Sequence, residues 1–161
     1  MCRSISPDDR LSAEGCEFEF QVLGRCPVGY KGYIKEPEAI QQVRKNQPAR
    51  KTSFMLQVEQ IFASQGVRCV FSTAVGTALD RHHHADGIVE FYGEVFKVDA
   101  TKNPLKTHGG DVDVVFGPEE VENPLRFVTQ LINVFVERQQ RASRVFVVSM
   151  ERPLSRRVRA A

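Results

Sequence analysis

The sequence predicts an α/β domain in which a mixed sheet is flanked by helices. Two segments, 52–66 and 119–143, repeat apolar residues at the three- and four-residue spacing of an amphipathic helix. Short runs rich in valine and phenylalanine lie between and after them, which is typical of strands. The chain has 161 residues, 42% of them hydrophobic, which is enough for one compact core.

Residues 1–51 are expected to form an appendage of a strand, a loop, a short helix and a basic linker. The run EFEFQV, residues 17–22, alternates polar and apolar side chains and predicts a strand with one wet face. Glycines and prolines then break the pattern until EPEAIQQVRKN, which predicts a short helix over 36–46. The basic run around Pro48 is typical of a solvated linker.

Residues 52–150 are expected to form the core, followed by a basic tail over 151–161. The first core helix has Thr52 or Ser53 as its N-cap. DVDVVFG is treated as a short inserted strand. The order of the other elements is therefore helix, three strands, helix, strand. The predicted strands cover residues 67–73, 86–92, 94–101, 111–117 (the insertion) and 144–150.

Composition excludes some classes of protein. The net charge of +2 allows contact with nucleic acid without indicating it. The first ten residues are charged and contain a proline, unlike a signal peptide, and no later apolar run approaches about 18 residues. A cytoplasmic protein with no membrane partner is therefore expected. The four cysteines show no C-x-x-C spacing and are given no role.

The predicted hairpin places charged side chains where strands are usually half buried. Because side chains alternate between the faces of a strand, Asp86 and Glu90 share one face of the first strand. Lys97 and Asp99 share one face of the second. With a loop at 92–93, Asp86 lies opposite Asp99. With a loop at 93–94 the two aspartates are no longer opposed but still share a face.

This pairing of aspartates predicts a metal site. Opposed side chains have Cβ atoms about 4.5–5.5 Å apart, where like charges repel unless a cation lies between them. A hard divalent cation such as Mg²⁺, which prefers oxygen ligands, would remove the repulsion. In the competing structural interpretation, Asp86 caps its strand and Asp99 belongs to a polar loop. Glu90 and Lys97 then form a surface ion pair of little energetic weight.

The order of elements, with an aspartate entering the second strand and an acidic residue late in the third, resembles the core of the PD-(D/E)xK, or restriction-endonuclease-like, nuclease superfamily. The resemblance covers about residues 52–150 and rests on a short motif. By position, Asp86 matches the first-motif aspartate, preceded here by Ala85 and not by proline. Asp99 matches the acidic residue of the second motif. Thr101 stands where the superfamily has its lysine.

The resemblance implies a metal-dependent nuclease that hydrolyses phosphodiester bonds in DNA. Asp86 and Asp99 would hold Mg²⁺ or Mn²⁺ and so activate a water molecule. Glu59 stands on the first helix where many members place a further acidic ligand; otherwise it is a solvent-facing helix residue. Lys97 or Lys102 would replace the missing lysine. Residues expected to support these groups without touching the metal are Glu90, His84 and Thr101.

The resemblance also implies nucleic acid as partner, and a homodimer would suit the cutting of two strands. The phosphate backbone would be held by scattered cations, whose contacts carry affinity but no sequence information. These cations are Arg44, Lys45, Arg50, Lys51 and Lys106. The alternative function is a catalytically inactive nuclease-like scaffold that binds nucleic acid or a protein partner, which the missing lysine favours.

Two other motifs allow weaker interpretations. RHHHAD suggests a transition-metal site, in which an extended segment would let His82, His84 and Asp86 converge. GGDVDVVF resembles the D-x-D strand of nucleotidyltransferases, but its glycines directly precede Asp111, which is the wrong spacing. We therefore expect Asp111 and Asp113 to line the wet face of an edge strand.

Overall fold

The computed structural model describes residues 16–103 and 111–151, with side chains as far as residue 147. Its centre is a four-stranded open sheet with the strand order β1-β2-β3-β4. The β1–β2 and β2–β3 pairs are antiparallel, and β4 runs parallel to β3. The strands are β1 (Cys69–Thr73), β2 (Gly87–Phe91), β3 (Glu94–Ala100) and β4 (Val114–Phe116).

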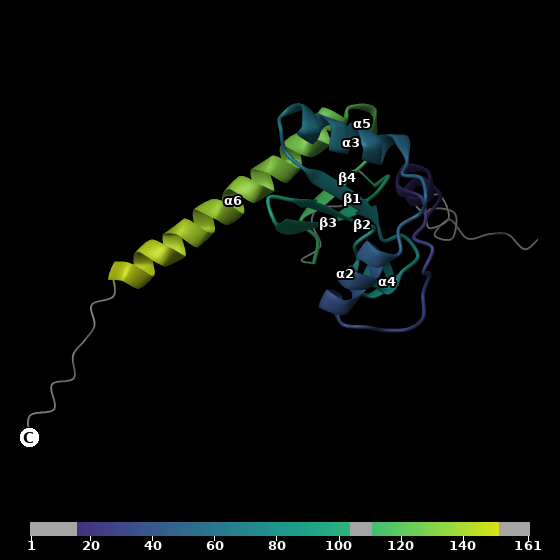
Figure 1. Cartoon of the computed structure of the whole chain (residues 1–161), viewed down its shortest axis with the longest axis horizontal. Helices are drawn as coiled ribbons and strands as arrows, with labels where there is room; N and C mark the ends of the chain where they lie inside the picture. Colours follow the sequence, from purple (N-terminus) through teal and green to yellow (C-terminus); the bar gives the residue numbers. More distant parts are fainter. Residues whose placement is uncertain (1–15, 104–110, 152–161) are drawn as a thin grey trace, which may run out of the picture.

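Helices cover both faces of this sheet (Figure 1), which confirms the predicted α/β class with a mixed sheet flanked by helices. Helices α3, α5 and α6 lie on one face, and α2 and α4 lie on the other. A further helical segment, residues 16–23, packs at the margin of the first layer through Phe18 and Val22. The bounds are α2 (Glu36–Lys45), α3 (Ser53–Ser64), α4 (Ala78–His83), α5 (Pro118–Glu122) and α6 (Pro124–Glu151).

The main core lies between the sheet and the layer of α3 and α6. Phenylalanines from both helices and from the strands meet there, with ring centroids 4.7–6.0 Å apart. These rings belong to Phe54, Phe71, Phe116 and Phe127. A smaller apolar cluster under α2 and α4 contains Val43, Leu79 and Ile88. Burial of these side chains is the main stabilising contribution to the fold.

The β2–β3 hairpin turns on two residues, Tyr92 and Gly93, with φ angles of 50° and 73°. Both angles are positive, as a type I′ turn requires, and glycine adopts this conformation without strain. The register pairs Ile88 with Lys97 and Gly87 with Val98. It therefore places Asp86 opposite Asp99, as predicted for a loop at 92–93.

Two predicted strands are wrong because both segments are helical. Residues 17–22 belong to the helical segment 16–23, in which Phe18 and Val22 lie one turn apart and both face the core. Residues 144–150 continue α6 to Glu151, since no proline or glycine lies between Pro124 and Glu151 to interrupt the helix.

The predicted element order also needs two corrections. Residues 111–117 are not an insertion, because they supply β4, the fourth strand of the sheet, which precedes the long helix. A short helix that was not predicted, α4, lies between β1 and β2. It makes the segment at His82 helical and not extended.

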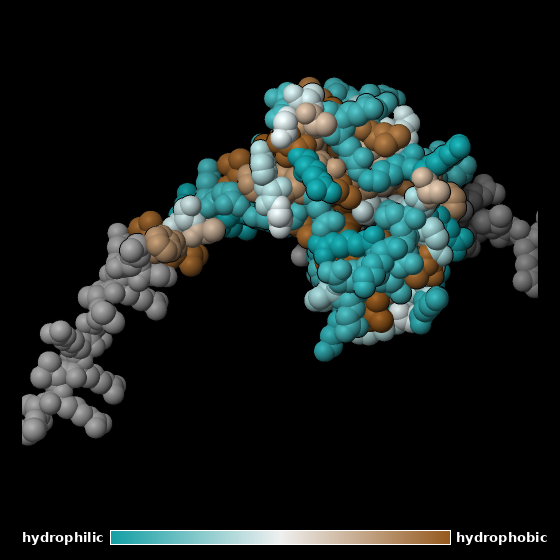
Figure 2. Space-filling view, viewed as in Figure 1, coloured by the Kyte–Doolittle hydropathy of each residue, from teal (hydrophilic) through white to brown (hydrophobic). Residues whose placement is uncertain are grey.

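The far half of α6 projects well beyond the sheet (Figure 1). Apolar side chains are visible near its outer end (Figure 2), where Val145, Phe146 and Val147 are exposed. None of the helices in the described part of the chain combines the length and apolar character needed to cross a bilayer.

Two phenylalanines of α6 test this packing. Phe127→Ala should lower the free energy of unfolding by about 3–5 kcal/mol, because the ring is buried among other phenylalanines. Phe146→Ala should change it by no more than about 0.5 kcal/mol, because that side chain is exposed. Chemical denaturation followed by circular dichroism measures both. Equal losses would show that residue 146 is buried, as the predicted strand would require.

Candidate functional site

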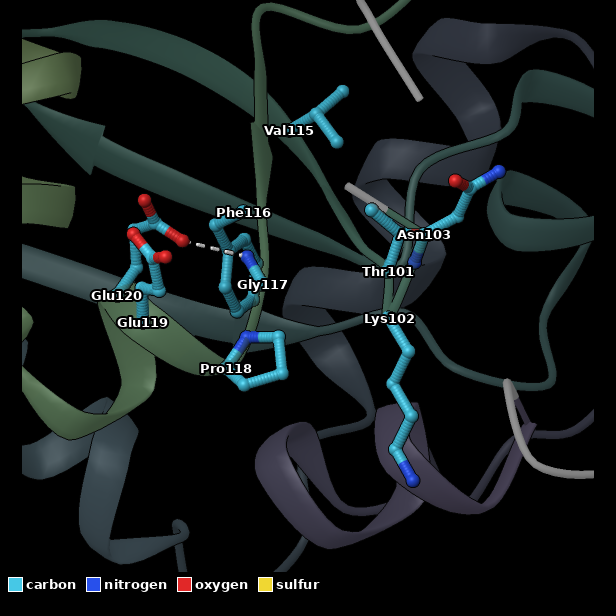
Figure 3. Close-up of a pocket in the computed structure, with 9 residues that line it drawn as sticks. All are labelled: Thr101, Lys102, Asn103, Val115, Phe116, Gly117, Pro118, Glu119 and Glu120. Carbon is cyan, nitrogen blue, oxygen red and sulfur yellow. Dashed lines mark hydrogen bonds between the residues drawn. The ribbon is translucent and has the colours of Figure 1, made fainter. Parts of the chain in front are cut away.

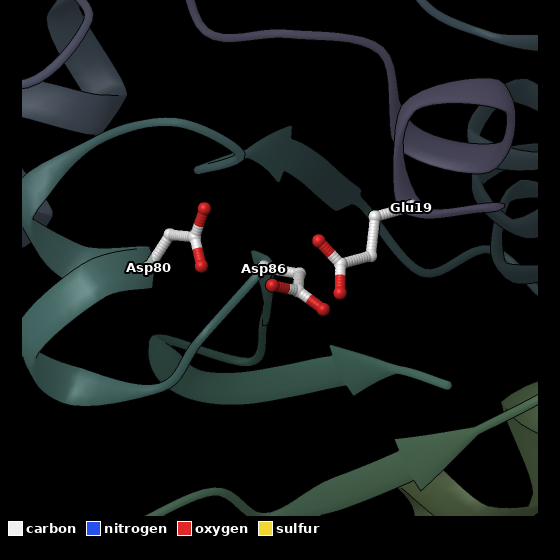
Figure 4. Close-up of side chains that lie close together, drawn as sticks. All are labelled: Glu19, Asp80 and Asp86. Carbon is white, nitrogen blue, oxygen red and sulfur yellow. The ribbon is translucent and has the colours of Figure 1, made fainter. Parts of the chain in front are cut away.

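Three carboxylates from different elements converge beside the start of β2. Glu19 comes from the helical segment 16–23, Asp80 from α4, and Asp86 directly precedes β2. One oxygen of each lies within 4.8 Å of the others, and the side chains point toward one another (Figure 4). Asp86 is buried, whereas Glu19 and Asp80 are partly buried. We call these residues, together with Asp99, the carboxylate cluster.

Asp99 joins the cluster through Asp86. It lies opposite Asp86 across the β2–β3 pair, is also buried, and forms a side-chain hydrogen bond with Asp86. Two carboxyl groups can form such a bond only when one of them carries a proton. The structure thus confirms the prediction that these two aspartates share a face.

The surroundings of Asp86 favour its protonated form. Burial, the negative charge of Glu19, and the hydrogen bond and charge of Asp99 raise the pKa of Asp86 to about 10. The backbone N–H of Ala100 donates to Asp86 Oδ2 at 2.8 Å and opposes this shift. No cation of the described residues offsets the negative charge at Asp86. A proton or a metal ion would neutralise it.

Hydrogen bonds with the backbone hold Asp86 and Asp80 in place. The N–H of Asp86 donates to the Val98 carbonyl at 2.9 Å, and its carbonyl accepts the N–H of Ala74 at 2.8 Å. A Cβ at Gly87 would lie 3.1 Å from the Ser72 carbonyl, so this close approach of strands favours glycine. In α4, Asp80 accepts the Gly76 N–H at 2.7 Å. Asp86 is thus fixed by the sheet and Asp80 by α4.

Cys16 lies next to the cluster, one turn before Glu19. Burial and the negative charges of Glu19, Asp80 and Asp86 raise the pKa of its thiol. The thiol therefore stays protonated near neutral pH and adds no further charge.

Glu90 and Lys97 do not pair with each other. In the observed register Glu90 lies opposite Val95, and Lys97 lies opposite Ile88. Glu90 instead binds Arg44 of α2, whose Nε donates at 2.8 Å. Lys97 Nζ lies 2.9 Å from a carboxylate oxygen of Glu36, also in α2. Both residues therefore connect α2 to the sheet, and Lys97 is occupied away from the cluster.

Glu59 is not brought to the cluster. Its carboxylate accepts the Phe71 N–H at 2.8 Å and forms an ion pair with Lys51, so it serves the outer edge of β1. The structure supplies Glu19 and Asp80 instead. Glu19 was missed because its segment was predicted as a strand, although the four-residue spacing of Phe18 and Val22 fits a helix.

Lys102 lies beside the helical segment 16–23, which carries Glu19. Its Nζ lies 6.0 Å from the ring centroid of Phe18, the neighbour of Glu19, and it makes no ion pair with any described residue. Thr101 donates its N–H to the Phe116 carbonyl at 2.8 Å, which joins β3 to β4. His84 is exposed and ends α4 with a φ of 55°.

The other candidate residues lie elsewhere. His82 belongs to α4 and contacts Tyr30, so it does not converge with His84 on Asp86. Asp113 binds Arg138 and accepts the Lys97 N–H, which is a structural role. Of the predicted phosphate contacts, Arg44 and Lys51 are ion-paired, Lys45 and Arg50 are exposed, and Lys106 lies outside the described residues.

A groove of about 470 Å³ opens between the end of β3 and the β4–α5 connection (Figure 3). Glu119 and Glu120 lie on one side, and Glu120 accepts the Gly117 N–H at 2.8 Å. The side chain of Lys102 starts on the other side and reaches toward the helical segment 16–23. Lys102 therefore extends from the groove to the helical segment that carries Glu19.

Comparison of the chain with models of protein families, with curated proteins and with solved structures finds no match. The interpretation of the site rests on its residues and their geometry.

Replacing Asp86 by asparagine should stabilise the metal-free protein. An aspartate of the unfolded chain ionises near about pH 3.9, whereas Asp86 in the folded protein has a pKa of about 10. Folding therefore takes up a proton between these values, and stability falls as pH rises through this window. Asp86→Asn removes that contribution. A gain of about 1 kcal/mol would raise the melting temperature by about 2–4 °C.

The measurement is thermal unfolding in EDTA from pH 5 to pH 9, with the exposed Asp111→Asn as matched control. The control should keep the pH dependence of the parent. Mn²⁺ should stabilise the parent and not the Asp86 variant, because the metal replaces the proton. The assignment fails if both variants respond alike to pH and to the metal.

Proposed function

We propose that this protein is a metal-dependent nuclease that hydrolyses phosphodiester bonds in DNA with Mg²⁺ or Mn²⁺. The observation that carries the proposal is the convergence of Glu19, Asp80 and Asp86, with Asp99 hydrogen-bonded to Asp86. Buried like charges cost free energy, and a metal ion bound among these carboxylates would offset the repulsion between them.

The donor set fits a hard divalent cation. Every member of the cluster offers carboxylate oxygen, which Mg²⁺ and Mn²⁺ prefer over nitrogen or sulfur. When bound, such a cation would lower the pKa of a coordinated water and polarise the phosphate. Asp86 and Asp99 would bind it from the sheet, and Glu19 and Asp80 from the two helical segments.

The sequence resemblance supports the same proposal. Asp86 and Asp99 match the two acidic motif positions, and they meet across the hairpin. A mixed sheet with helices on both faces is compatible with a restriction-endonuclease-like core. The order of elements differs from the resemblance at one point, because the long helix expected between the third and fourth strands is α6, which follows β4.

Lys102 takes the role of the missing lysine in this proposal. Lys97 already neutralises Glu36, whereas Lys102 lies near Phe18 and makes no ion pair in the described chain. Its positive charge would offset negative charge that develops on the phosphate. Thr101, which stands at the lysine position of the motif, would not take part in this charge stabilisation, because the adjacent Lys102 provides it.

DNA as partner and a homodimer belong to the same proposal. Lys45 and Arg50 are exposed cations that could contact a phosphate backbone. A dimer would give each strand of a duplex its own site. The competing function is an inactive scaffold, in which Asp86 and Asp99 share a proton permanently and no metal binds.

Cleavage assays separate these two functions. Single-stranded, duplex and branched DNA are incubated with the parent and with Asp99→Asn in Mg²⁺ or Mn²⁺. We expect Asp99→Asn to cut at least about 100-fold more slowly. Loss of a residue that only supports a metal ligand lowers activity by up to about 100-fold, and loss of a ligand itself should lower it at least as much. The exposed Asp111→Asn should cut as the parent does. Equal cleavage by Asp99→Asn overturns the site, and cleavage by neither protein favours the scaffold.

A pair of lysine variants tests the assignment of the cation. Lys102→Met should lower the turnover rate by about 10²–10³-fold, the usual cost of one group that stabilises transition-state charge. Lys97→Met should leave the rate unchanged and lower stability by about 1 kcal/mol or less, because it loses only the ion pair with Glu36. Single-turnover kinetics and thermal unfolding measure the two effects. The reverse ranking would assign the role to Lys97.

A further inference from the structure

Five aromatic and basic side chains lie together on the surface beside α4. Tyr30 and Tyr33 come from the connection between the helical segment 16–23 and α2, which passes around α4 (Figure 1). Arg81, His82 and His83 come from α4 itself. We call these residues the tyrosine–histidine patch. None of them belongs to the carboxylate cluster or to the main core.

Specific contacts hold the rings in fixed positions. Tyr30 Oη lies 2.6 Å from His82 Nε2, and the Arg81 guanidinium carbon lies 4.5 Å from the centre of the Tyr30 ring. Tyr33 meets His82 edge-on, with ring centroids 5.3 Å apart. A ring nitrogen of His83 lies 2.9 Å from the Ile34 carbonyl. The patch is thus ordered by hydrogen bonds and ring contacts and not by burial.

The tyrosines of the patch remain open to solvent. Tyr33 is 65% exposed and Tyr30 is 40% exposed. Tyrosine usually buries its ring and leaves only the hydroxyl in water. A ring that is held in place and exposed to solvent can receive another flat ring, and bases of single-stranded nucleic acid stack on aromatic side chains in this way.

The charge around the patch favours a phosphate-bearing partner. Four exposed cations lie near the two tyrosines. Arg81 packs over the Tyr30 ring, and the other three are close to the tyrosines in the sequence: Arg25, Lys31 and Lys35. A Cβ at Gly76 would lie 3.4 Å from Arg25 Nε, so this arginine packs against the turn that leads into α4. Cations that follow a stacking surface are the usual means of holding a single-stranded backbone.

Helix α4 connects the patch to the carboxylate cluster. Asp80 contributes to the cluster, and the next three residues of the same helix contribute to the patch. One helical turn advances only about 5.4 Å, so the residues of α4 that belong to the patch lie within about one turn of Asp80 along the helix.

We propose that the tyrosine–histidine patch binds single-stranded DNA by stacking unpaired bases on Tyr33 and Tyr30. The inference rests on the proposed nuclease function and names its substrate class, which is DNA with an unpaired segment at the site of cleavage. Bases in an intact duplex are already stacked on each other and must be unstacked before a side chain can cover them. Arg81, Lys31 and Lys35 contact the phosphates of the bound strand.

Fluorescence anisotropy tests this with a labelled oligonucleotide of about 12 nucleotides and with a blunt duplex of the same sequence. Binding is measured in EDTA and, in a second series, in Ca²⁺, so that it is read without reference to cleavage. The parent should bind the single strand more tightly than the duplex. Tyr33→Ala should weaken single-strand binding by about 5- to 100-fold, the loss of one stacked base. Tyr33→Phe, which keeps the ring, should bind as the parent does.

Tyr92→Ala is the matched control. Tyr92 is 66% exposed, close to the value for Tyr33, but it lies on the turn at the opposite end of β2 from Asp86. Its replacement should leave single-strand binding unchanged. Melting temperatures of all variants show that they are folded, and duplex binding should be equal in all of them.

Several outcomes overturn the inference. They are unchanged single-strand binding by Tyr33→Ala, equal or tighter binding of the duplex by the parent, and no saturable binding of the single strand in either series. Failure of the proposed function is separate. A protein that binds the single strand through Tyr33 but never cuts DNA keeps the patch and loses the nuclease. A protein that cuts while Tyr33→Ala binds normally keeps the nuclease and loses the patch.

Discussion

The register of the β2–β3 hairpin is the constraint on which the sheet and the candidate site both depend. The two-residue turn at Tyr92 and Gly93 directs Phe96 and Val98 into the main core. The same register directs Lys97 and Asp99 to the opposite face. A slip of one residue would exchange the two faces and bury charges among phenylalanine rings, which makes any other register strongly unfavourable.

Charged side chains on that opposite face have two different kinds of neighbour. Toward the turn, Glu90 and Lys97 each have a partner of opposite charge in α2. At the other end of the strands, Asp86 and Asp99 lie together with the acidic groups of Glu19 and Asp80. The ion pairs near the turn are structural contacts, whereas the gathered carboxylates are the feature on which the proposed metal site rests.

Local pattern predicted the helix at α3 and the strands β1 to β3 because their periodicity reflects one buried face. It failed for segment 16–23, where alternation over six residues also matched a helix that presents Phe18 and Val22 to the core. It failed again for residues 144–150, where β-branched residues extend a helix that was already formed. Propensity is a weak guide when the neighbouring residues have already set the conformation.

The sequence by itself determined that Asp86 and Asp99 share a face, because strand alternation and a tight turn are local properties. The structure decided between the two possible registers and placed the two aspartates opposite each other. Only the tertiary structure decided the rest of the site. It brought Glu19 and Asp80 from two separate helical segments, paired Glu59 and Lys97 elsewhere, and placed Tyr30 against His82. These contacts join residues distant in the chain, and they depend on how the helices pack on the sheet, which no local spacing records.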